Sequence, residues 1–366
     1  MERNEIFVIH GTDYVNMTRR LLERMDLQAD IGNRDQRIAI KPNLVLDADP
    51  SDGATTHPEI VEGVITYLQE HGFHNIQVME GSWVGARTSL AVKVTGTQKV
   101  LDKLGVPFVD LQHDGSRDYD AAGVKIKICD AIMAADYWIN IPVMKGHCQT
   151  TITCALKNAK GLIPNSEKRR FHTMGLHKPI AHLNAALPRG CVVVDNICGD
   201  LDFEEGGNPV TMNRIWGGKD PVLCDAYACR CLGYDISEVE YIGIAQRIGV
   251  GSADLENLQV IALNEAKDLA DPRKGTRRIQ RLARHVQPDC ACSACYGSLI
   301  YALNKLDNDG LLRRLDEQIA IGQGCKGKTG KLGVGSCTAK FDCSLKGCPP
   351  TAAEMHRFLR EYICRK

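Results

Sequence analysis

The sequence lacks several features that would have assigned it to a class at once. No apolar run in its 366 residues approaches the roughly 18 that a membrane span requires. The 45 Lys and Arg residues are balanced by 45 Asp and Glu residues, so no excess positive charge indicates nucleic acid or an anionic membrane as a partner. The opening residues, MERNEIFVIHG, lack the basic, apolar and small-residue regions of a signal peptide. We therefore expect a cytoplasmic protein that binds neither nucleic acid nor membrane.

Cysteine is absent from residues 1–128 but abundant afterwards. Of the 16 cysteines, eight lie at irregular intervals from Cys129 to Cys231 and eight crowd into residues 290–364. In a reducing compartment a disulfide framework is not expected, which leaves buried filling and metal ligation as the alternatives. The apolar neighbours of the first group favour a role as small buried side chains in the core. Nearby Gly, Pro and Cys residues favour ligation for the second.

Short β-rich runs alternate with longer helical patterns through the first 260 residues. Strands are predicted at EIFVIH, RIAIKPNLVL, NIQVMEGS, VPFVDL, AADYWINIPVMKGH and CVVVDNICGD. One of the intervening helices has Thr56 and Glu59 at capping-box spacing, with Pro58 in its first turn, and is predicted to stop at Gly72. The alternation predicts an α/β fold with a doubly wound, mainly parallel sheet and helices on both faces.

The composition changes near residue 280, where we place a domain boundary. Residues 264–289 are polar and basic and fit a connecting helix. Residues 290–366 are rich in Gly and Cys and end in a predicted helix, TAAEMHRFLREYIC. We expect an α/β domain with an anion or substrate crevice over 1–280 and a smaller cysteine-rich module over 281–366.

The cysteines of this module have the pattern of a four-thiolate site. Cys292-Ser-Ala-Cys295 brings two sulfurs together, and Cys337 and Cys348, each preceded closely by Gly, can complete the set. Zinc ribbons favour two Cys-x-x-Cys pairs and this chain has one, so the spacing favours one [4Fe–4S] cluster over structural zinc. The pattern also resembles the surroundings of the proximal cluster in nickel–iron hydrogenase small subunits. Three further cysteines could replace one of these ligands: Cys290, Cys325 and Cys343.

A second set of polar residues follows four predicted strands, at the ends where parallel sheets bind ligands. It comprises Lys41, Asn43, Glu80, Lys145, His147 and Asp195, with the run Lys157-Asn158-Ala-Lys160-Gly161 a short way beyond. Lysine and amide groups suit a carboxylate or phosphate. We therefore predict that a small anion binds to Lys41, Asn43, Lys157, Asn158 and Asp195.

His147 and Lys145 are the candidate catalytic residues of this crevice. Gly146 between them would let the turn bend so that both side chains face the same space, and the Lys145 charge would lower the His147 pKa. A neutral imidazole there could exchange a proton with the substrate. The alternative is that His147 only hydrogen-bonds the following loop and holds the strand end in place.

Two further patterns invite a ligand. Residues 322–329 match the phosphate-loop pattern Gly-x-x-x-x-Gly-Lys-Thr, but the glycines that follow leave no place for the helix that such a loop needs, so we predict no nucleotide binding. His172, His177 and His182 could bind a metal, although their five-residue spacing does not place them on one helical face.

Five segments together identify a family resemblance. IAIKPNLV, TTHPEIVEGVITYLQEHG, IPVMKGHCQTTITCALKNAKGLIP, CVVVDNI and KDPVLCDAYACRCLGYD resemble, in order, the blocks of the domain-of-unknown-function 362 family over roughly residues 5–260. Members of that family often carry an iron–sulfur module, so the resemblance implies the fold and a cluster but no reaction. The module here departs from the ferredoxin-like run of four closely spaced cysteines, which favours one cluster over two.

Three hypotheses for function remain. The first is a cytoplasmic iron–sulfur oxidoreductase that passes electrons from the cluster to a small anionic substrate or cofactor in the α/β domain. The second is an electron-transfer or scaffold protein without its own substrate, which docks a redox partner protein through the basic C-terminal module. The third is a non-redox enzyme in which Lys and His perform acid–base chemistry beside a structural cluster.

Overall fold

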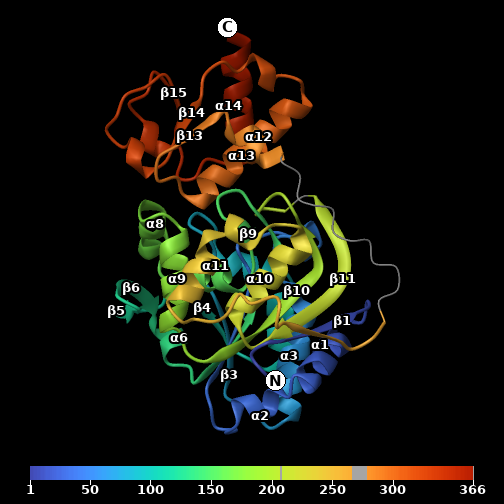
Figure 1. Cartoon of the computed structure of the whole chain (residues 1–366). Coiled ribbons are helices and arrows are strands. Elements are labelled where there is room, and N and C mark those ends of the chain that lie inside the picture. Colours follow the sequence, from blue (N-terminus) through green and yellow to red (C-terminus); the bar gives the residue numbers. More distant parts are fainter. Residues whose placement is uncertain (207, 266–277, 366) are drawn as a thin grey trace.

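An eight-stranded sheet forms the centre of the larger part of the molecule (Figure 1). The computed structural model describes residues 1–206, 208–265 and 278–365. The sheet order is β12-β1-β11-β10-β7-β2-β3-β4, with bounds β1 Glu5–His10, β2 Ile38–Pro42, β3 Ile76–Glu80, β4 Phe108–Asp110, β7 Tyr137–Ile141, β10 Gly190–Asp200, β11 Pro209–Gly218 and β12 Gln259–Ala262. Strand β11 runs antiparallel to both of its neighbours, and the other neighbouring pairs are parallel. The predicted α/β class with a mainly parallel sheet is confirmed.

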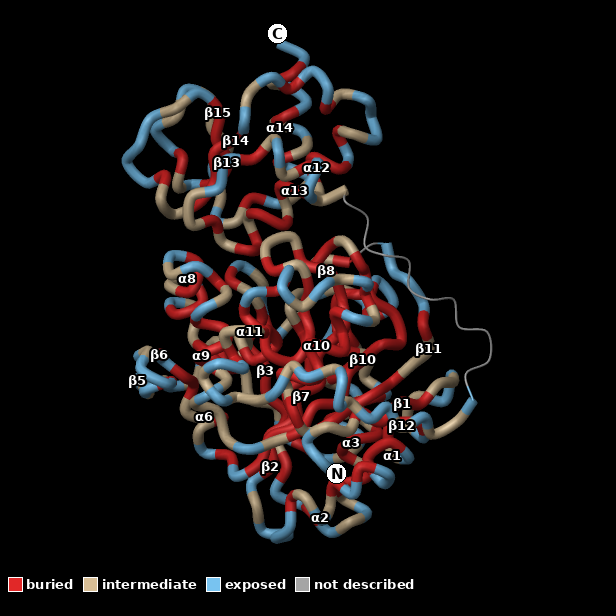
Figure 2. The backbone as a smooth tube through the Cα atoms, in the orientation of Figure 1, coloured by how far each residue is buried: buried red, intermediate tan, exposed pale blue. Residues whose placement is uncertain are grey.

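Helices cover both faces of this sheet because successive strand residues point to opposite sides. Ile38 and Ile40 belong to one apolar core, and Ala39 between them belongs to the other. The first core includes residues of α1 Tyr14–Arg24, α3 Pro58–Glu70 and α5 Thr97–Leu104; the second includes residues of α9 His177–Ala186, α10 Pro221–Leu232 and α11 Glu240–Arg247. Figure 2 shows the buried strands between these two layers.

The remaining elements of this part are short. The helices are α2 Leu27–Ile31, α4 Thr88–Val94, α6 Asp130–Met133, α7 Ala155–Asn158 and α8 Asn165–Thr173. Two antiparallel pairs stand apart from the large sheet, β5 Ser116–Ala121 with β6 Val124–Cys129, and β8 Lys145–His147 with β9 Thr151–Thr153. Among the residues that the structure describes, no helix has both the length and the apolar character needed to cross a bilayer.

The C-terminal part has its own sheet and its own apolar core, and lies against one end of the larger part (Figure 1). Its four parallel strands follow chain order: β13 Val286–Pro288, β14 Ile319–Ile321, β15 Leu332–Val334 and β16 Cys343–Leu345. Its helices are α12 Arg278–Ala283, α13 Ser293–Asn308 and α14 Ala352–Arg365. Residues 266–277 of the predicted connecting helix lie outside the described residues, and the described remainder contains α12 and β13.

Two local predictions are wrong. The segment AADYWINIPVMKGH forms two strands, β7 and β8. Pro142 has no N–H to offer the ladder, pairing with β10 resumes as a single bridge between Val143 and Asp195, and β8 then pairs with β9. The cap of α3 is His57 rather than Thr56, and no side chain forms a capping hydrogen bond there. The Thr56 hydroxyl instead accepts from Asn43 N at 2.8 Å and donates to Ile141 O at 2.9 Å, which ties two strand ends together.

Candidate anion pocket and cysteine cluster

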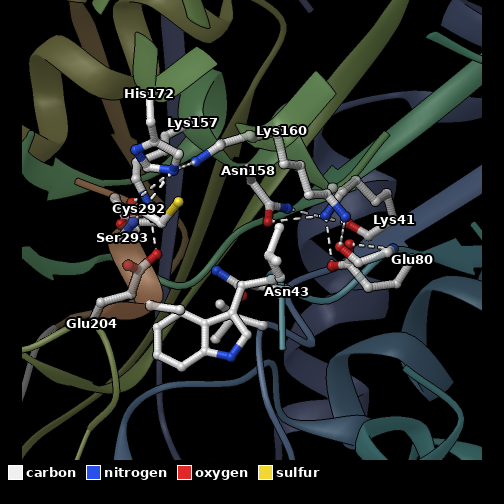
Figure 3. A pocket seen from close by; sticks show the side chains of 18 residues that line it. Lys41, Asn43, Glu80, Lys157, Asn158, Lys160, His172, Glu204, Cys292 and Ser293 are labelled. Carbon is white, nitrogen blue, oxygen red and sulfur yellow. Dashed lines mark hydrogen bonds and ion pairs between the residues drawn. The ribbon is translucent and has the colours of Figure 1, made fainter. Parts of the chain in front are cut away.

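A pocket of about 590 Å³ lies where the carboxyl ends of β2 and β3 meet α7, α8 and the start of α13 (Figure 3). Four of the five predicted anion-binding residues line it: Lys41, Asn43, Lys157 and Asn158. They come together because parallel strands and their following turns open at the same edge of a sheet. Lys160, Lys168, His172, Glu204 and Cys292 also contribute to the lining.

Two of the pocket lysines are held by buried carboxylates. Lys41 Nζ lies 2.7 Å from Glu80 Oε2 and also donates to Asn158 Oδ1 at 3.1 Å. Lys157 Nζ lies 2.6 Å from Glu204 Oε1. Burial lowers the pKa of Lys41 and the Glu80 charge opposes that shift, as expected for a buried ion pair. These two pairs therefore add no net charge to the pocket.

Replacing Glu80 by Gln is expected to lower the free energy of unfolding by about 3 kcal/mol, because it leaves the Lys41 ammonium buried without its counter-charge. Urea denaturation followed by circular dichroism measures the change. Glu62→Gln is the matched control, since Glu62 pairs with the largely exposed Lys103 and its loss should change stability by less than about 1 kcal/mol. Equal effects of the two variants would contradict a structural role for the buried pair.

The other two lysines carry charge that the described residues do not neutralise. Lys160 Nζ lies 2.9 Å from His172 Nε2, and Lys168 Nζ donates to the carbonyl oxygens of Gly81 and Ser82 at 2.8 and 2.9 Å. Burial, reinforced by the Lys157 charge, lowers the pKa of Lys160 to about 7, and burial lowers the pKa of Lys168 to about 8. Near neutral pH the pocket is thus suited to a small anion.

Sequence reasoning missed part of this set. Lys160 belongs to a run singled out in the sequence, but Lys168 lies in the first turn of α8 and Glu204 in the loop after β10. Neither follows a strand end directly, and no local pattern marks them. Only the tertiary structure brings them to the pocket.

His147 and Lys145, the predicted catalytic pair, do not line the pocket but stand behind Glu204. Lys145 Nζ donates to Ala54 O at 2.6 Å and to Glu204 O at 2.8 Å. His147 Nδ1 accepts from the backbone N–H groups of Gln149 and Thr150, both at 3.0 Å, so its proton is on Nε2, which lies 2.7 Å from Glu204 Oε2. This arrangement positions Glu204 and the following loop.

The pKa of His147 is lowered to about 4, in the direction expected, but mainly by burial, with charge repulsion from Lys157 rather than Lys145. The reason for Gly146 also differs from the expected one. A Cβ atom at residue 146 would lie 2.2 Å from Leu201 O, so glycine is needed for close backbone approach.

Asp195, the fifth predicted anion ligand, also lies outside the pocket. Its Oδ2 is 2.9 Å from His57 Nδ1.

The four proposed cluster ligands come from the loops at one edge of the small sheet. Cys292 caps α13 and Cys295 lies in its first turn, whereas Cys337 follows β15 and Cys348 follows β16. Gly335 and Gly347 precede the latter two with φ of +92° and +146°, values that favour glycine. Burial raises the pKa of Cys295 to about 12, and Cys292, Cys348 and Cys337 each act on it in the same direction.

The three alternative ligands are placed differently. Cys325 follows β14 and is electrostatically coupled to Cys337 and Cys290, whereas Cys343 begins β16.

The first cysteine group, from Cys129 to Cys231, is mainly buried. Six of its eight members are buried: Cys129, Cys154, Cys191, Cys198, Cys224 and Cys229. Among the described residues, no three His, Cys, Asp or Glu side chains gather tightly enough to hold a single metal ion.

In the fold, the phosphate-loop pattern and the three histidines singled out in the sequence make contacts with other protein groups. Lys328 of the phosphate-loop pattern pairs with Asp289 at 2.7 Å, and strand β15 follows instead of a helix. His172 lines the pocket, His177 stacks on Tyr241, and His182 Nδ1 lies 2.8 Å from Ala121 O.

The fold and the pocket define an α/β protein with a lysine-lined crevice covered by a cysteine-rich module. The chain belongs to the family described as "Domain of unknown function (DUF362)", whose model matches residues 38–230. A thylakoid-associated protein of Synechocystis sp. is 29% identical over 157 residues, which are 42% of this chain and 47% of that protein. The chain therefore spans about half the length of this curated relative.

Two solved structures are similar at low identity. The lactate racemase apoprotein from Thermoanaerobacterium thermosaccharolyticum is 14% identical, with a TM-score of 0.42 over 64% of this chain and 57% of that one. A protein from Thermotoga maritima is 15% identical, with a TM-score of 0.37 over 60% and 59% of the two chains. Neither likeness bears on activity.

Proposed function

We propose that this protein is a cytoplasmic iron–sulfur oxidoreductase that passes electrons to a small anion bound in the lysine-lined pocket. The observation that carries the proposal is that Cys292, a proposed cluster ligand, lines the same pocket as Lys160 and Lys168. Burial raises the pKa of Cys292 and the Lys160 charge opposes that shift, so the thiol and the ammonium group act on each other directly. A redox centre at Cys292 would adjoin the bound anion.

The donor set suits a [4Fe–4S] cluster held by Cys292, Cys295, Cys337 and Cys348. All four are free thiols, and Gln323 Nε2 donates to Cys292 Sγ at 3.5 Å, an outer hydrogen bond of the kind that tunes iron–sulfur centres. When bound, such a cluster supplies one-electron transfer. A reducing cytoplasm would keep the remaining cysteines as thiols.

The protein's own residues would bind and orient the substrate. The ammonium groups of Lys160 and Lys168 attract the anion, while Asn43 and Asn158 offer amide groups beside it. With its pKa lowered to about 7, Lys160 can donate a proton from Nζ near neutral pH, and His172 Nε2 holds that group in place. In this scheme His147 is a positioning residue for Glu204.

The cysteine-rich module would also exclude water from the pocket. Ser293 N donates to His172 Nε2 at 3.3 Å, and Ser293 Oγ donates to Gln149 Oε1 at 2.8 Å. Gln149 Nε2 in turn donates to Ala291 O at 3.0 Å. These bonds seat the loop before α13 on the α/β part, so that a charge in the pocket acts in a medium of reduced dielectric.

Electrons would arrive from a redox partner protein at the exposed surface of the cysteine-rich module. Cys348 is exposed there, and the surrounding residues 326–346 carry one acidic residue, Asp342, against five exposed lysines: Lys326, Lys328, Lys331, Lys340 and Lys346. Such a surface favours an acidic electron carrier through charge complementarity. The same surface would serve the alternative function of an electron-transfer protein without its own substrate.

Iron and sulfide analysis of anaerobically purified protein tests the proposal. We expect about four irons and four sulfides per chain, a broad visible absorption, and bleaching of that absorption by dithionite. A colourless protein with one zinc per chain would overturn the proposal. A cluster that stays in one redox state with every donor tried would instead favour the acid–base enzyme with a structural cluster.

A further inference from the structure

A thiol, an imidazole and a carboxylate stand in line at the end of β10, outside the anion pocket. Cys198 Sγ lies 3.9 Å from His57 Nε2, and His57 Nδ1 lies 2.9 Å from Asp195 Oδ2. This is the order of groups in a nucleophile–base–carboxylate triad, in which the carboxylate orients the ring and the ring shares the proton of the nucleophile. None of the three residues lines the pocket.

The pairing of β10 with β11 is irregular beside these residues. Residues 195 and 198 are an odd number of positions apart, so a regular strand would direct their side chains to opposite faces. The register with β11 shifts between Asn196 and Cys198, from Asn196 opposite Arg214 to Cys198 opposite Thr211. Met212 and Asn213 of β11 therefore stand opposite Ile197 alone, and Asn213 has a positive φ of 46°. This bulge adjoins the segment of β10 from which Asp195 and Cys198 both contact His57, and bulges commonly re-aim side chains near them.

The surrounding charges favour the protonated form of His57. Burial alone would lower its pKa, but the Asp195 charge and the hydrogen bonds with Asp195 and Cys198 outweigh that effect and raise it to about 11. Asp195 Oδ2 accepts from His57 N as well, at 2.8 Å, and Oδ1 accepts from Ile197 N at 3.0 Å, so the carboxylate is fixed.

Other titratable groups also act on this site. His57 lowers the pKa of Asp49, in addition to the larger effect of hydrogen bonds from Ser51, which places a second carboxylate near the ring. Tyr14, on α1, has a pKa raised by burial and by Cys198, Asp195 and Glu59. The negative groups outnumber the positive ones, and an imidazolium beside Cys198 is the ion that this environment favours.

We propose that Cys198 is an activated thiol that hydroperoxides oxidise to a sulfenic acid. Its thiolate sulfur attacks one peroxide oxygen, so that an S–O bond forms while the O–O bond breaks and sulfur gives up two electrons. The leaving hydroxide takes the proton from His57 Nε2 and departs as water. A small oxidant is required because Cys198 is only 5% exposed.

Two carbonyl groups compete with His57 for the thiol proton. Cys198 Sγ lies 3.4 Å from Pro50 O and 3.7 Å from Ser51 O. If either oxygen kept the proton, the sulfur would remain a thiol and react as slowly as an ordinary buried cysteine. The rate of oxidation therefore distinguishes an activated site from a structural one.

The test exposes the full chain to hydrogen peroxide, traps sulfenic acid with dimedone and maps the label by mass spectrometry. Cys191, on the same strand, is the internal control, since burial raises its pKa to about 12. We expect Cys198 to be labelled at least tenfold faster than Cys191. Its rate should change less than about threefold between pH 6 and 8, a range over which an ordinary thiol gains roughly a hundredfold.

His57→Gln and Asp195→Asn are each expected to slow the labelling of Cys198 at pH 7 by about tenfold or more. Labelling of Cys198 at the rate of Cys191, or a rate that His57→Gln leaves unchanged in folded protein, overturns the proposal. Should His57→Gln fail to fold, the pH profile of the unmodified chain decides alone: a steep rise with pH contradicts an activated thiol, and a flat profile supports it.

Discussion

Replacing Cys337 by Ala is expected to remove most of the iron and sulfide from anaerobically purified protein and with them its visible absorption. Cys337 is coupled to Cys292, Cys295 and Cys348, and the loss of one thiolate opens the set to water. Iron and sulfide content per chain, together with the absorption spectrum, measures the effect. Cys364→Ala is the matched control, because Cys364 is exposed on α14 and is neither a proposed nor an alternative ligand.

The same measurement separates the alternative ligand sets. Cys325→Ala and Cys343→Ala should keep their iron and sulfide if Cys337 and Cys348 complete the site. If Cys325→Ala loses its iron and Cys337→Ala keeps it, then the turn after β14 supplies the ligand. A protein that retains full iron content in every single variant would contradict a thiolate-held cluster in this module.

Replacing Lys160 or Lys168 by Met is expected to weaken anion binding in the pocket by at least about tenfold each. These are the two lysines without a carboxylate partner among the described residues, and each buried charge acts through a medium of reduced dielectric. Isothermal titration calorimetry with sulfate as the probe measures the affinity. Lys178→Met, at an exposed position on α9, is the matched control and should leave the affinity unchanged.

The pH dependence of sulfate binding follows from the same two groups. Sulfate keeps its charge between pH 6 and 9, whereas Lys160, with a pKa of about 7, and Lys168, with a pKa of about 8, lose protons over this range. The affinity should therefore fall as pH rises, and binding near pH 8 should take up protons from the buffer. An affinity that does not vary with pH would show that these lysines do not hold the anion.

The sequence predicted the pocket where chain order and sheet geometry agree. Lys41 is the last residue but one of β2 and Asn43 follows the strand directly, and a parallel sheet carries such residues to a common edge. His147 was predicted to join them because it follows the apolar run YWINIPVM. Beyond the bridge of Val143 to Asp195, however, the chain leaves the large sheet and β8 pairs with β9 in a separate ribbon, so His147 lies behind Glu204. The break in the strand after β7 therefore determines which residues line the pocket.

The prediction drawn from the cysteine spacing rests on local geometry instead. Cys292 and Cys295 are neighbours through local helical geometry, and glycines at positive φ mark the turns of Cys337 and Cys348. The antiparallel strand β11 and the shift in its register with β10 depend on long-range pairing, which no local pattern encodes. The sequence therefore could not predict that Cys198 lies beside His57.

The seating of the loop before α13 has a consequence for how the molecule is assembled. The wall formed by Cys292 and Ser293 is synthesised long after Lys41 and Lys160, which remain open to water until that loop docks on Gln149 and His172. A nascent chain that has completed only its large sheet thus has no enclosed pocket. The enclosure of the pocket is therefore the last step in building this part of the protein, and a chain that fails to form its cysteine-rich module leaves the pocket open.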